Sequence, residues 1–365
     1  LTSPLIGRLR NRYYGLFIDD SWKLTAKLTL NLGLRYDLQT PFFERDNHMT
    51  SFDLNPASPT HATLVPAANG VIRSRTFSDL ATKNLAPRIG AAYQMTPKTV
   101  LRAAFGIFYG GLGYQDVAHT GVANPPNFVS VSLPSPTSAA VSNFVLADGF
   151  PSGFLDPAHV QNPNLFSVAR NFPMPMVNQW NVAVERELPG NSVLTVAYVG
   201  SSAEHLSGDI DVNAPPPGPG AINPRRLFPQ YGQIIAQSPY AHSTYAGLQV
   251  TFQRRFSRGF SLLTNYTWSH SLDNVLNNED NVGGSIPQDP HDSNAEKASS
   301  GFDVQHRFVT SVIYQLPIGQ AGGRLGNSAF TRTVFGGWQI GGIFVAQGGF
   351  PLTLSVSPNP ANTTT

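Results

Sequence analysis

Six polar side chains stand in stretches where apolar and polar residues alternate, which makes them candidates for contacting a ligand. They are Asn31, Arg35, Arg88, Arg102, Gln249 and Asn265. On a strand, successive side chains point to opposite faces, so these residues would lie on the wet face of a half-apolar sheet. If that face lines an enclosed interior, the six residues would contact a ligand or a domain held inside. The simpler interpretation, which we favour, is that the arginines pair with neighbouring carboxylates such as Asp37.

The segment 272–303 could supply oxygen ligands for a cation. Against Lys297 alone it carries Asp273, Glu279, Asp280, Asp289, Asp292, Glu296 and Asp303. Carboxylates are the ligands that Ca²⁺ prefers, but the fixed spacing of an EF-hand loop is absent. We therefore favour a solvated acidic loop and expect no metal site.

Nothing in the sequence indicates catalysis. It contains no GxSxG, HExxH, phosphate-loop or GxGxxG motif and no cysteine. Its nine histidines are scattered, and His270 and His306, near predicted strand ends, are best explained as surface residues. The formal charge is only +2, which gives no basis for nucleic-acid binding. We predict a protein that is not an enzyme, with no cofactor and no nucleic-acid partner.

The segment 110–178 is nearly uncharged and rich in aromatic residues. It holds Phe128, Phe144, Phe150, Phe154, Phe166 and Phe172 among Asn and Pro. Such rings either grip an apolar ligand or sugar, or pack the loop against its neighbours. The sequence favours neither.

Alternation with period two predicts the elements that position these side chains. In 28–37, Leu28, Leu30, Leu32, Leu34 and Tyr36 fall on one face, with polar residues and Gly33 on the other. Similar strands are predicted at 14–22, 88–94, 101–109, 179–187, 192–200, 246–254 and 260–269, with weaker candidates at 304–315 and 337–346. An eleventh strand could begin near Leu352.

The predicted connections alternate between short and long. Short ones are 23–27, 95–99, 188–191 and 255–259, and long ones are 38–83, 110–178, 201–243 and 272–303. This asymmetry is typical of up-and-down membrane barrels, with tight turns inside and long loops outside. Strands such as 28–36 measure about 26 Å, close to the apolar band of about 25 Å in such barrels. The sequence predicts an all-β protein, an antiparallel transmembrane β-barrel segment of ten or eleven strands in the outer membrane.

Several segments together resemble the barrels of TonB-dependent outer-membrane receptors, especially the Oar-like branch. They are YYGLFIDDSWKLTAKLTLNLGLRYD (13–37), NLAPRIGAAYQMTPKTVLRAAFGIFYG (84–110), QWNVAVERELPGNSVLTVAYVGSSAEHL (179–206), LQVTFQRRFSRGFSLLTNYTWSHSLDN (248–274), FDVQHRFVTSVIYQLPIG (302–319) and GGWQIGGIFVAQGGFPLTL (336–354). The order of these segments and their shared turn chemistry carry the resemblance.

The resemblance implies uptake of a scarce ligand of unknown chemistry across the outer membrane of a Gram-negative bacterium, energised by the inner-membrane TonB complex. It implies that residues 1–365 form part of a 22-stranded barrel. We expect the carboxypeptidase-regulatory-like domain, the plug, the TonB-contacting segment and the C-terminal strands to lie outside this sequence. Two alternatives stay open: an adhesion or secretion barrel of the same fold, and a soluble carbohydrate-binding β-protein.

Overall fold

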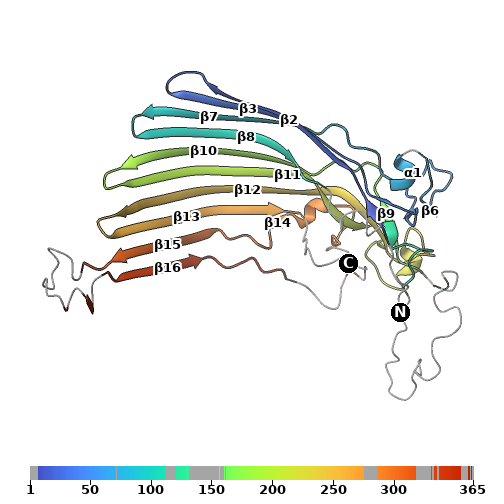
Figure 1. Cartoon of the computed structure of the whole chain (residues 1–365). Coiled ribbons are helices and arrows are strands. Elements are labelled where there is room, and N and C mark those ends of the chain that lie inside the picture. Colours follow the sequence, from blue (N-terminus) through green and yellow to red (C-terminus); the bar gives the residue numbers. More distant parts are fainter. Residues whose placement is uncertain are drawn as a thin grey trace, which may run out of the picture.

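A computed structural model of the chain shows one large antiparallel sheet. The structure describes residues 7–70, 72–111, 121–130, 156, 160, 162–274, 286–317, 330, 333–334, 337–354, 361 and 363. The main sheet holds 12 strands, ten of which form a continuous path in the order β16-β15-β13-β12-β11-β10-β8-β7-β3-β2. Figure 1 shows them side by side as a single curved layer. In the described part of the chain, no helix is long and apolar enough to span a membrane.

All ten predicted strands are confirmed. They are β2 (Tyr13–Lys23), β3 (Leu28–Gln39), β7 (Leu85–Thr96), β8 (Thr99–Tyr109), β10 (Met176–Leu188), β11 (Ser192–Asp211), β12 (Ile234–Ser257), β13 (Phe260–Asp273), β15 (His306–Gln315) and β16 (Gln339–Gln347). The structure describes residues 351–354 of the predicted eleventh strand, and these residues form no strand. Leu352 and Leu354 there are at least 90% exposed, and a segment without a hydrogen-bonded neighbour cannot be a strand.

Tight turns join the strands at one end of the sheet, which we call the turn end (Figure 1). Between β12 and β13, Ser257 pairs with Phe260, and the two residues between them, Arg258 and Gly259, have φ of 50° and 76°. Positive φ at both central residues is what a type I′ turn requires, and this turn matches the natural twist of a hairpin. The connection from β15 to β16, residues 316–338, is longer than the other connections at this end.

The two faces of the sheet differ in chemistry. One face presents apolar residues to the surroundings, among them Ile18, Leu32, Ile89 and Val182, which are 40–70% exposed. The other carries Asn, Gln, Arg, Ser and Gly. An exposed apolar face this wide would be unstable in water and indicates contact with lipid. We call these the lipid face and the polar face.

At the opposite end, the loop end, two strands run further than predicted. β11 continues to Asp211 and β12 starts at Ile234, so the irregular part of the predicted loop 201–243 is only 212–233. Register shifts between Ala203, Leu206 and Gly208 interrupt the pairing, and His205 has a φ of 59°. Bulges break the period of two, which explains why alternation missed these extensions.

Shorter elements pack at the loop end into what we call the loop assembly, defined as residues 40–70, 72–84, 121–130, 162–175 and 205–241. It contains β4 (Phe43–Glu44), which pairs with β1 (Leu9–Arg10), the pair β5 (Thr50–Phe52) and β6 (Leu64–Pro66), the helix α1 (Ile72–Thr76), the turn η3 (Asn223–Arg225) and β9 (Leu165–Val168), which pairs in parallel with β12. The predicted loops 38–83 and 110–178 thus contain ordered structure.

The two clusters of buried apolar residues lie in the loop assembly, at the loop end of the sheet. Phe52, Leu165 and Ile234 are at most 1% exposed and pack against Val212, Phe228 and Tyr231. A smaller cluster holds Phe42, Val168 and Phe172. Phe172 therefore packs the loop, while Phe128 and Phe166 are half-buried; Phe144, Phe150 and Phe154 lie outside the described residues.

Candidate functional site

The strand register places all six predicted polar residues on the polar face. Asn31 pairs with Gly90, Gly90 with Ala104, and Ala104 with Asn181, which makes one row of side chains across four strands. Arg88 belongs to the adjacent row with Gly33 and Gly106, and Arg35 to the row after that. Arg102 and Gln249 share a further row through Ala183 and Ala197, with Asn265 beyond it. Whether these residues contact a ligand or a plug stays a prediction.

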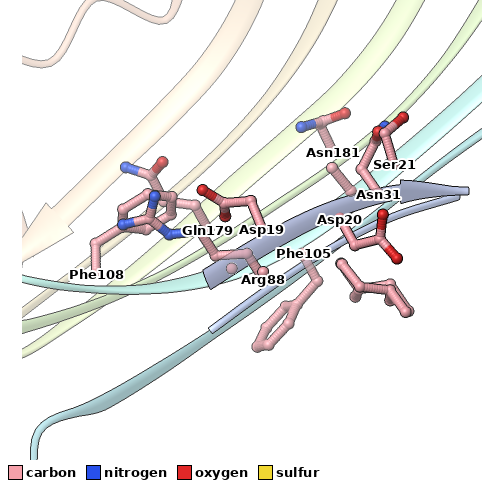
Figure 2. Close-up of a pocket in the computed structure, with 15 residues that line it drawn as sticks. Asp19, Asp20, Ser21, Asn31, Arg88, Phe105, Phe108, Gln179 and Asn181 are labelled. Carbon is pink, nitrogen blue, oxygen red and sulfur yellow. The ribbon is translucent and has the colours of Figure 1, made fainter. Parts of the chain in front are cut away.

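Two of the six, Asn31 and Arg88, line a concavity of about 610 Å³ on the polar face. The other polar side chains around it come from β2 and β10: Asp19, Ser21, Gln179 and Asn181. Figure 2 shows these side chains on one side of the sheet, with Asp20 and Phe105 pointing to the other side. The structure thus joins residues that are up to 162 positions apart, from Asp19 to Asn181.

Glycines make room for the charged side chains of the concavity. A Cβ atom at Gly33 would lie 2.5 Å from the Asp19 carboxylate, which passes over this residue. A Cβ atom at Gly106 would lie 3.0 Å from the Phe108 ring and 3.3 Å from Arg88 Cγ. Larger residues at Gly33 and Gly106 would therefore displace Asp19, Phe108 and Arg88.

Arg88 is the cation of this concavity. Its guanidinium lies 4.5 Å from the centre of the Phe108 ring, a cation–π contact. Its Nε is buried and has no hydrogen-bond partner among the residues that the structure describes. An unsatisfied buried donor is costly. The Arg88 side chain as a whole is only partly buried, so the exposed part of its guanidinium is suited to bind an acceptor from outside the sheet.

Arg35 is held by an ion pair, as the simpler interpretation predicts. Its Nε lies 2.8 Å from Asp37 Oδ1, and its Nη2 donates to the Tyr13 hydroxyl at 3.0 Å. The Tyr13 hydroxyl in turn donates to Asp37. Because Asp37 is only 2% exposed, these contacts satisfy a nearly buried carboxylate.

The remaining predicted residues lie apart from the concavity. Arg102 is exposed and Gln249 half-buried. Asn265 Oδ1 accepts a hydrogen bond from the Thr251 hydroxyl at 2.9 Å. These residues extend the polar face toward the turn end without forming a second cluster with Asn31 and Arg88.

The described part of the acidic segment 272–303 uses its carboxylates locally. Asp289 and Asp292 accept hydrogen bonds from the backbone N–H groups of His291 and Asn294, respectively. This part of the segment also contains η4 (Ser293–Glu296) and β14 (Ala298–Ser299), and Asp273 lies at the end of β13. No group of three or more His, Asp or Glu residues in the described part of the chain is placed to hold a metal ion. Glu279 and Asp280 lie outside the described residues.

The two strand-end histidines have polar partners. His270 Nδ1 lies 2.8 Å from the buried Asp303 carboxylate, and His306 Nδ1 lies 2.9 Å from the Tyr266 hydroxyl. His270 is therefore more than an isolated surface residue, because it anchors the segment that carries Asp303.

The concavity is suited to binding. Amide groups of Asn and Gln together with one carboxylate and one guanidinium can hydrogen-bond a polar solute or a protein surface. The predicted set lacked four polar residues of this lining, Asp19, Ser21, Gln179 and Asn181. For Asp19 and Ser21 the available signal was their alternation with Ile18 and Trp22, which the adjacent Asp20 on the apolar face obscures.

A family model described as "Outer membrane beta barrel domain" matches residues 3–365. A comparison with curated proteins finds no match. Among solved structures, the chain is similar to the Pseudomonas aeruginosa receptor FpvA in complexes with pyoverdines, with 11% identity, a TM-score of 0.46, and coverage of 93% of this chain and 28% of that one.

Two further solved structures are similar to the chain. One is the alcaligin receptor FauA of Bordetella pertussis, with 11% identity, a TM-score of 0.41, and coverage of 93% of this chain and 38% of that one. The other is the iron transporter FrpB of Neisseria meningitidis, with 11% identity, a TM-score of 0.43, and coverage of 84% and 30%. The chain thus spans well under half the length of each of these three structures.

Proposed function

The chain belongs to the outer membrane β-barrel domain family, and from this premise we propose that it is part of a TonB-dependent receptor that takes up a ligand. Its location is the outer membrane. The alternative of a soluble carbohydrate-binding protein is wrong, because the family is a membrane family and the lipid face exposes Ile18, Leu32 and Ile89.

The observation that carries the proposal is the polar concavity on the face turned away from lipid. A barrel that served only as a wall would need no site where Asp19, Arg88 and Asn181 converge over a floor of small residues. Glycine at Gly33 and Gly106 keeps this space open. In a closed barrel the polar face would surround the lumen, so the concavity would meet either a passing solute or a plug.

The proposal assigns Asn31, Arg35, Arg88, Arg102, Gln249 and Asn265 as contacts of a ligand or a plug. Arg88 is the strongest of them, because it lines the concavity and is only partly buried. Arg35 is the weakest, because Asp37 and Tyr13 already hold its Nε and Nη2 and fix the side chain within the sheet. The resemblance to TonB-dependent receptors, in particular to the Oar-like branch, supports the energy source, since the outer membrane holds neither ATP nor an ion gradient.

Within the described part of the chain the sheet has two open edges, which support a larger barrel. The path of ten strands ends at β2 and β16. In hydrocarbon, each unpaired N–H or C=O group costs several kcal/mol, so spanning sheets close on themselves. Plugged outer-membrane transporters close with about 22 strands, and we propose that further strands of the same polypeptide complete this wall.

An uptake experiment in cells tests the proposal. Strains with and without the full-length gene, each with and without a functional TonB complex, are grown in a complex medium, and the depletion of solutes is measured by mass spectrometry. The proposal predicts at least one solute whose depletion requires both the gene and the complex. Failure to find such a solute in media limiting for carbon, iron and vitamins would contradict it.

Two adjacent positions give matched variants for this assay. Asn181→Trp fills the concavity, whereas Val182→Trp places the same side chain on the lipid face, where Val182 is 47% exposed. We expect Asn181→Trp to reduce uptake and Val182→Trp to leave it unchanged at equal surface expression. An equal loss of uptake in both variants would show that the concavity is not part of the transport path.

A further inference from the structure

A second cleft lies in the loop assembly, away from the concavity of the sheet. Its volume is about 660 Å³, within the range of about 300–1,000 Å³ usual for small-molecule sites. One wall comes from residues between β5 and α1, and the other from β9 and the extensions of β11 and β12. In Figure 1 these elements gather beyond the strand ends at the loop end.

The walls of this cleft are held rigidly by contacts across the chain. The Ser167 hydroxyl donates to the Phe52 carbonyl at 2.7 Å, and the Val168 backbone N–H donates to the Ser51 hydroxyl at 3.0 Å. Behind them, the Asn124 amide donates to the carbonyls of Thr50 and Phe166 at 2.7 and 2.9 Å. A site built on such fixed walls loses little entropy when a ligand binds.

Much of the lining is apolar. Leu54, Phe77, Val168, Ile210 and Val212 contribute to it. When the register is followed through the two bulges, Ile210 pairs with Ala236 on the side of the ladder that continues the polar face. The cleft would therefore accommodate the apolar body of a ligand above the interior of the proposed barrel.

Two arginines in the lining converge on one carboxylate. Arg170 Nε lies 3.0 Å from Asp79 Oδ2, and Arg73 Nη1 lies 3.6 Å from Asp79 Oδ1. All three side chains are about half exposed. A guanidinium has five N–H donors, so one carboxylate leaves donors of both arginines open to a second anion.

The other charged group of the lining, Asp53, is engaged within its own turn. Its carboxylate accepts hydrogen bonds from the Asn55 backbone N–H and the Thr60 hydroxyl. Partial burial raises the pKa of Asp53, but these hydrogen bonds and one from Ser58 outweigh it, so the pKa lies below its ordinary value. Asp53 thus carries a negative charge near neutral pH, and its hydrogen bonds hold that carboxylate within its own turn. Arg73 and Arg170 are the cations of the lining and therefore the groups that can attract and hold an anion.

We propose that this cleft binds a small organic acid with an apolar body, whose carboxylate is held by Arg73 and Arg170. A planar carboxylate matches the fork of a guanidinium in two parallel hydrogen bonds, and the apolar walls take up the rest of the molecule. The inference rests on the proposed receptor function, and it names the class of ligand and the place of first binding.

Binding to the full-length protein in lipid nanodiscs tests the inference, with phenylbutyrate as the probe and phenylbutanamide as its uncharged match. Titrations followed by ligand-observed NMR should show phenylbutyrate binding at least about tenfold more tightly than the amide, the ratio expected for one charge-assisted hydrogen-bonded pair. Equal affinity of the two compounds, or no saturable binding of phenylbutyrate, would overturn the inference.

Variants locate the binding. Arg73→Gln combined with Arg170→Gln should weaken phenylbutyrate binding about tenfold and leave the amide unaffected. Ala68→Trp, at an exposed position of the lining, should block both compounds. Arg45→Gln, in the same loop region but outside the lining, should change neither. Binding that survives both the double variant and Ala68→Trp would refute the site.

This assay is independent of transport. The binding tests in nanodiscs could succeed while the gene and the TonB complex affect no solute in cells. That result would support the ligand site in the cleft and contradict the receptor function. Conversely, uptake could depend on the gene and the TonB complex while the phenylbutyrate tests fail. That result would support the receptor function and contradict the ligand site in the cleft.

Discussion

The main sheet and the loop assembly differ in where they place their apolar side chains. In the sheet, large apolar side chains such as Leu16 and Ile18 are 72% and 70% exposed. In the loop assembly, Phe52 and Leu165 are 1% and 0% exposed, and they pack as in a water-soluble domain. The difference shows that apolar residues in this chain are placed for two solvents, lipid around the strands and water around the loops.

Buried polar groups follow the same division. In the loop assembly, Arg226 and Asp211 form an ion pair at 3.6 Å with both side chains at most 4% exposed, and Asn213 donates to the Gly232 carbonyl at 2.7 Å. On the polar face of the sheet, Arg102 is exposed and Arg88 is only partly buried. Fully buried polar groups need fixed partners, whereas Arg88 and Arg102 on the polar face remain available to a second molecule.

The largest difference is expected between two Phe→Ala substitutions in the full-length protein. Phe52→Ala should destabilise the loop assembly by about 3–5 kcal/mol, because it leaves a cavity in a packed core. Phe105→Ala, on the lipid face, should cost far less, because acyl chains can fill the space. Hydrogen exchange followed by mass spectrometry measures both, and equal costs would show that the sheet has a packed core on that face.

A smaller effect separates the two faces of the sheet. Leu32→Arg should destabilise the protein in lipid by about 2–4 kcal/mol, as a charge near the bilayer midplane does. Asn31→Arg, one residue away on the polar face, should cost much less. Denaturant unfolding in lipid vesicles gives both values, and similar costs at the two positions would undermine the assignment of the faces.

The smallest of the three effects is a pH dependence confined to the loop assembly. Burial raises the pKa of Glu44, but hydrogen bonds from the backbone N–H groups of His48, Arg8 and Asp46 outweigh it, so the pKa falls below its ordinary value of 4.5. A lowered pKa in the folded state contributes stability above 4.5, which is lost as the pH falls through the folded value.

Hydrogen exchange of residues 44–48 as a function of pH checks this expectation. Protection should decrease below pH 4.5 in the native protein and lose that dependence in Glu44→Gln, which should itself cost about 1–3 kcal/mol locally. Protection that instead increases on acidification would reverse the sign assigned to Glu44.

Alternation was sufficient to predict the ten strands because the lipid face is almost continuously apolar. It failed where the chain leaves that environment. Beyond Ala203, bulges shift the register, and the extended ends of β11 and β12 serve the loop assembly. The core of that assembly depends on contacts such as Ser167 to Phe52, 115 residues apart, which no local pattern contains.

The candidate site was predictable only in part. The spacing of Arg35 and Asp37 on one strand puts both on the same face, so their ion pair follows from the sequence. The meeting of Asp19 and Arg88 over Gly33 depends on the register of three strands, and register is set by all pairings together. Arg170 meets Arg73 at Asp79 because the Ser78 hydroxyl and the Asp79 N–H donate to the carbonyls of Ala169 and Arg170. No local pattern in the sequence predicts these contacts, which join segments about 91 residues apart.

The central claim, that one face of the sheet meets lipid and the other does not, is tested most directly by spin labelling along β3. The chain has no cysteine, so single cysteines can be introduced from position 28 to 36, omitting Gly33, in the full-length protein in lipid bilayers. Collision with molecular oxygen and with a water-soluble nickel chelate is then measured at each label. If this face meets lipid, oxygen accessibility is high at Leu28, Leu30, Leu32, Leu34 and Tyr36, and low at Thr29, Asn31 and Arg35. Oxygen accessibility without a period of two, or with its maxima at Asn31 and Arg35, would contradict the central claim.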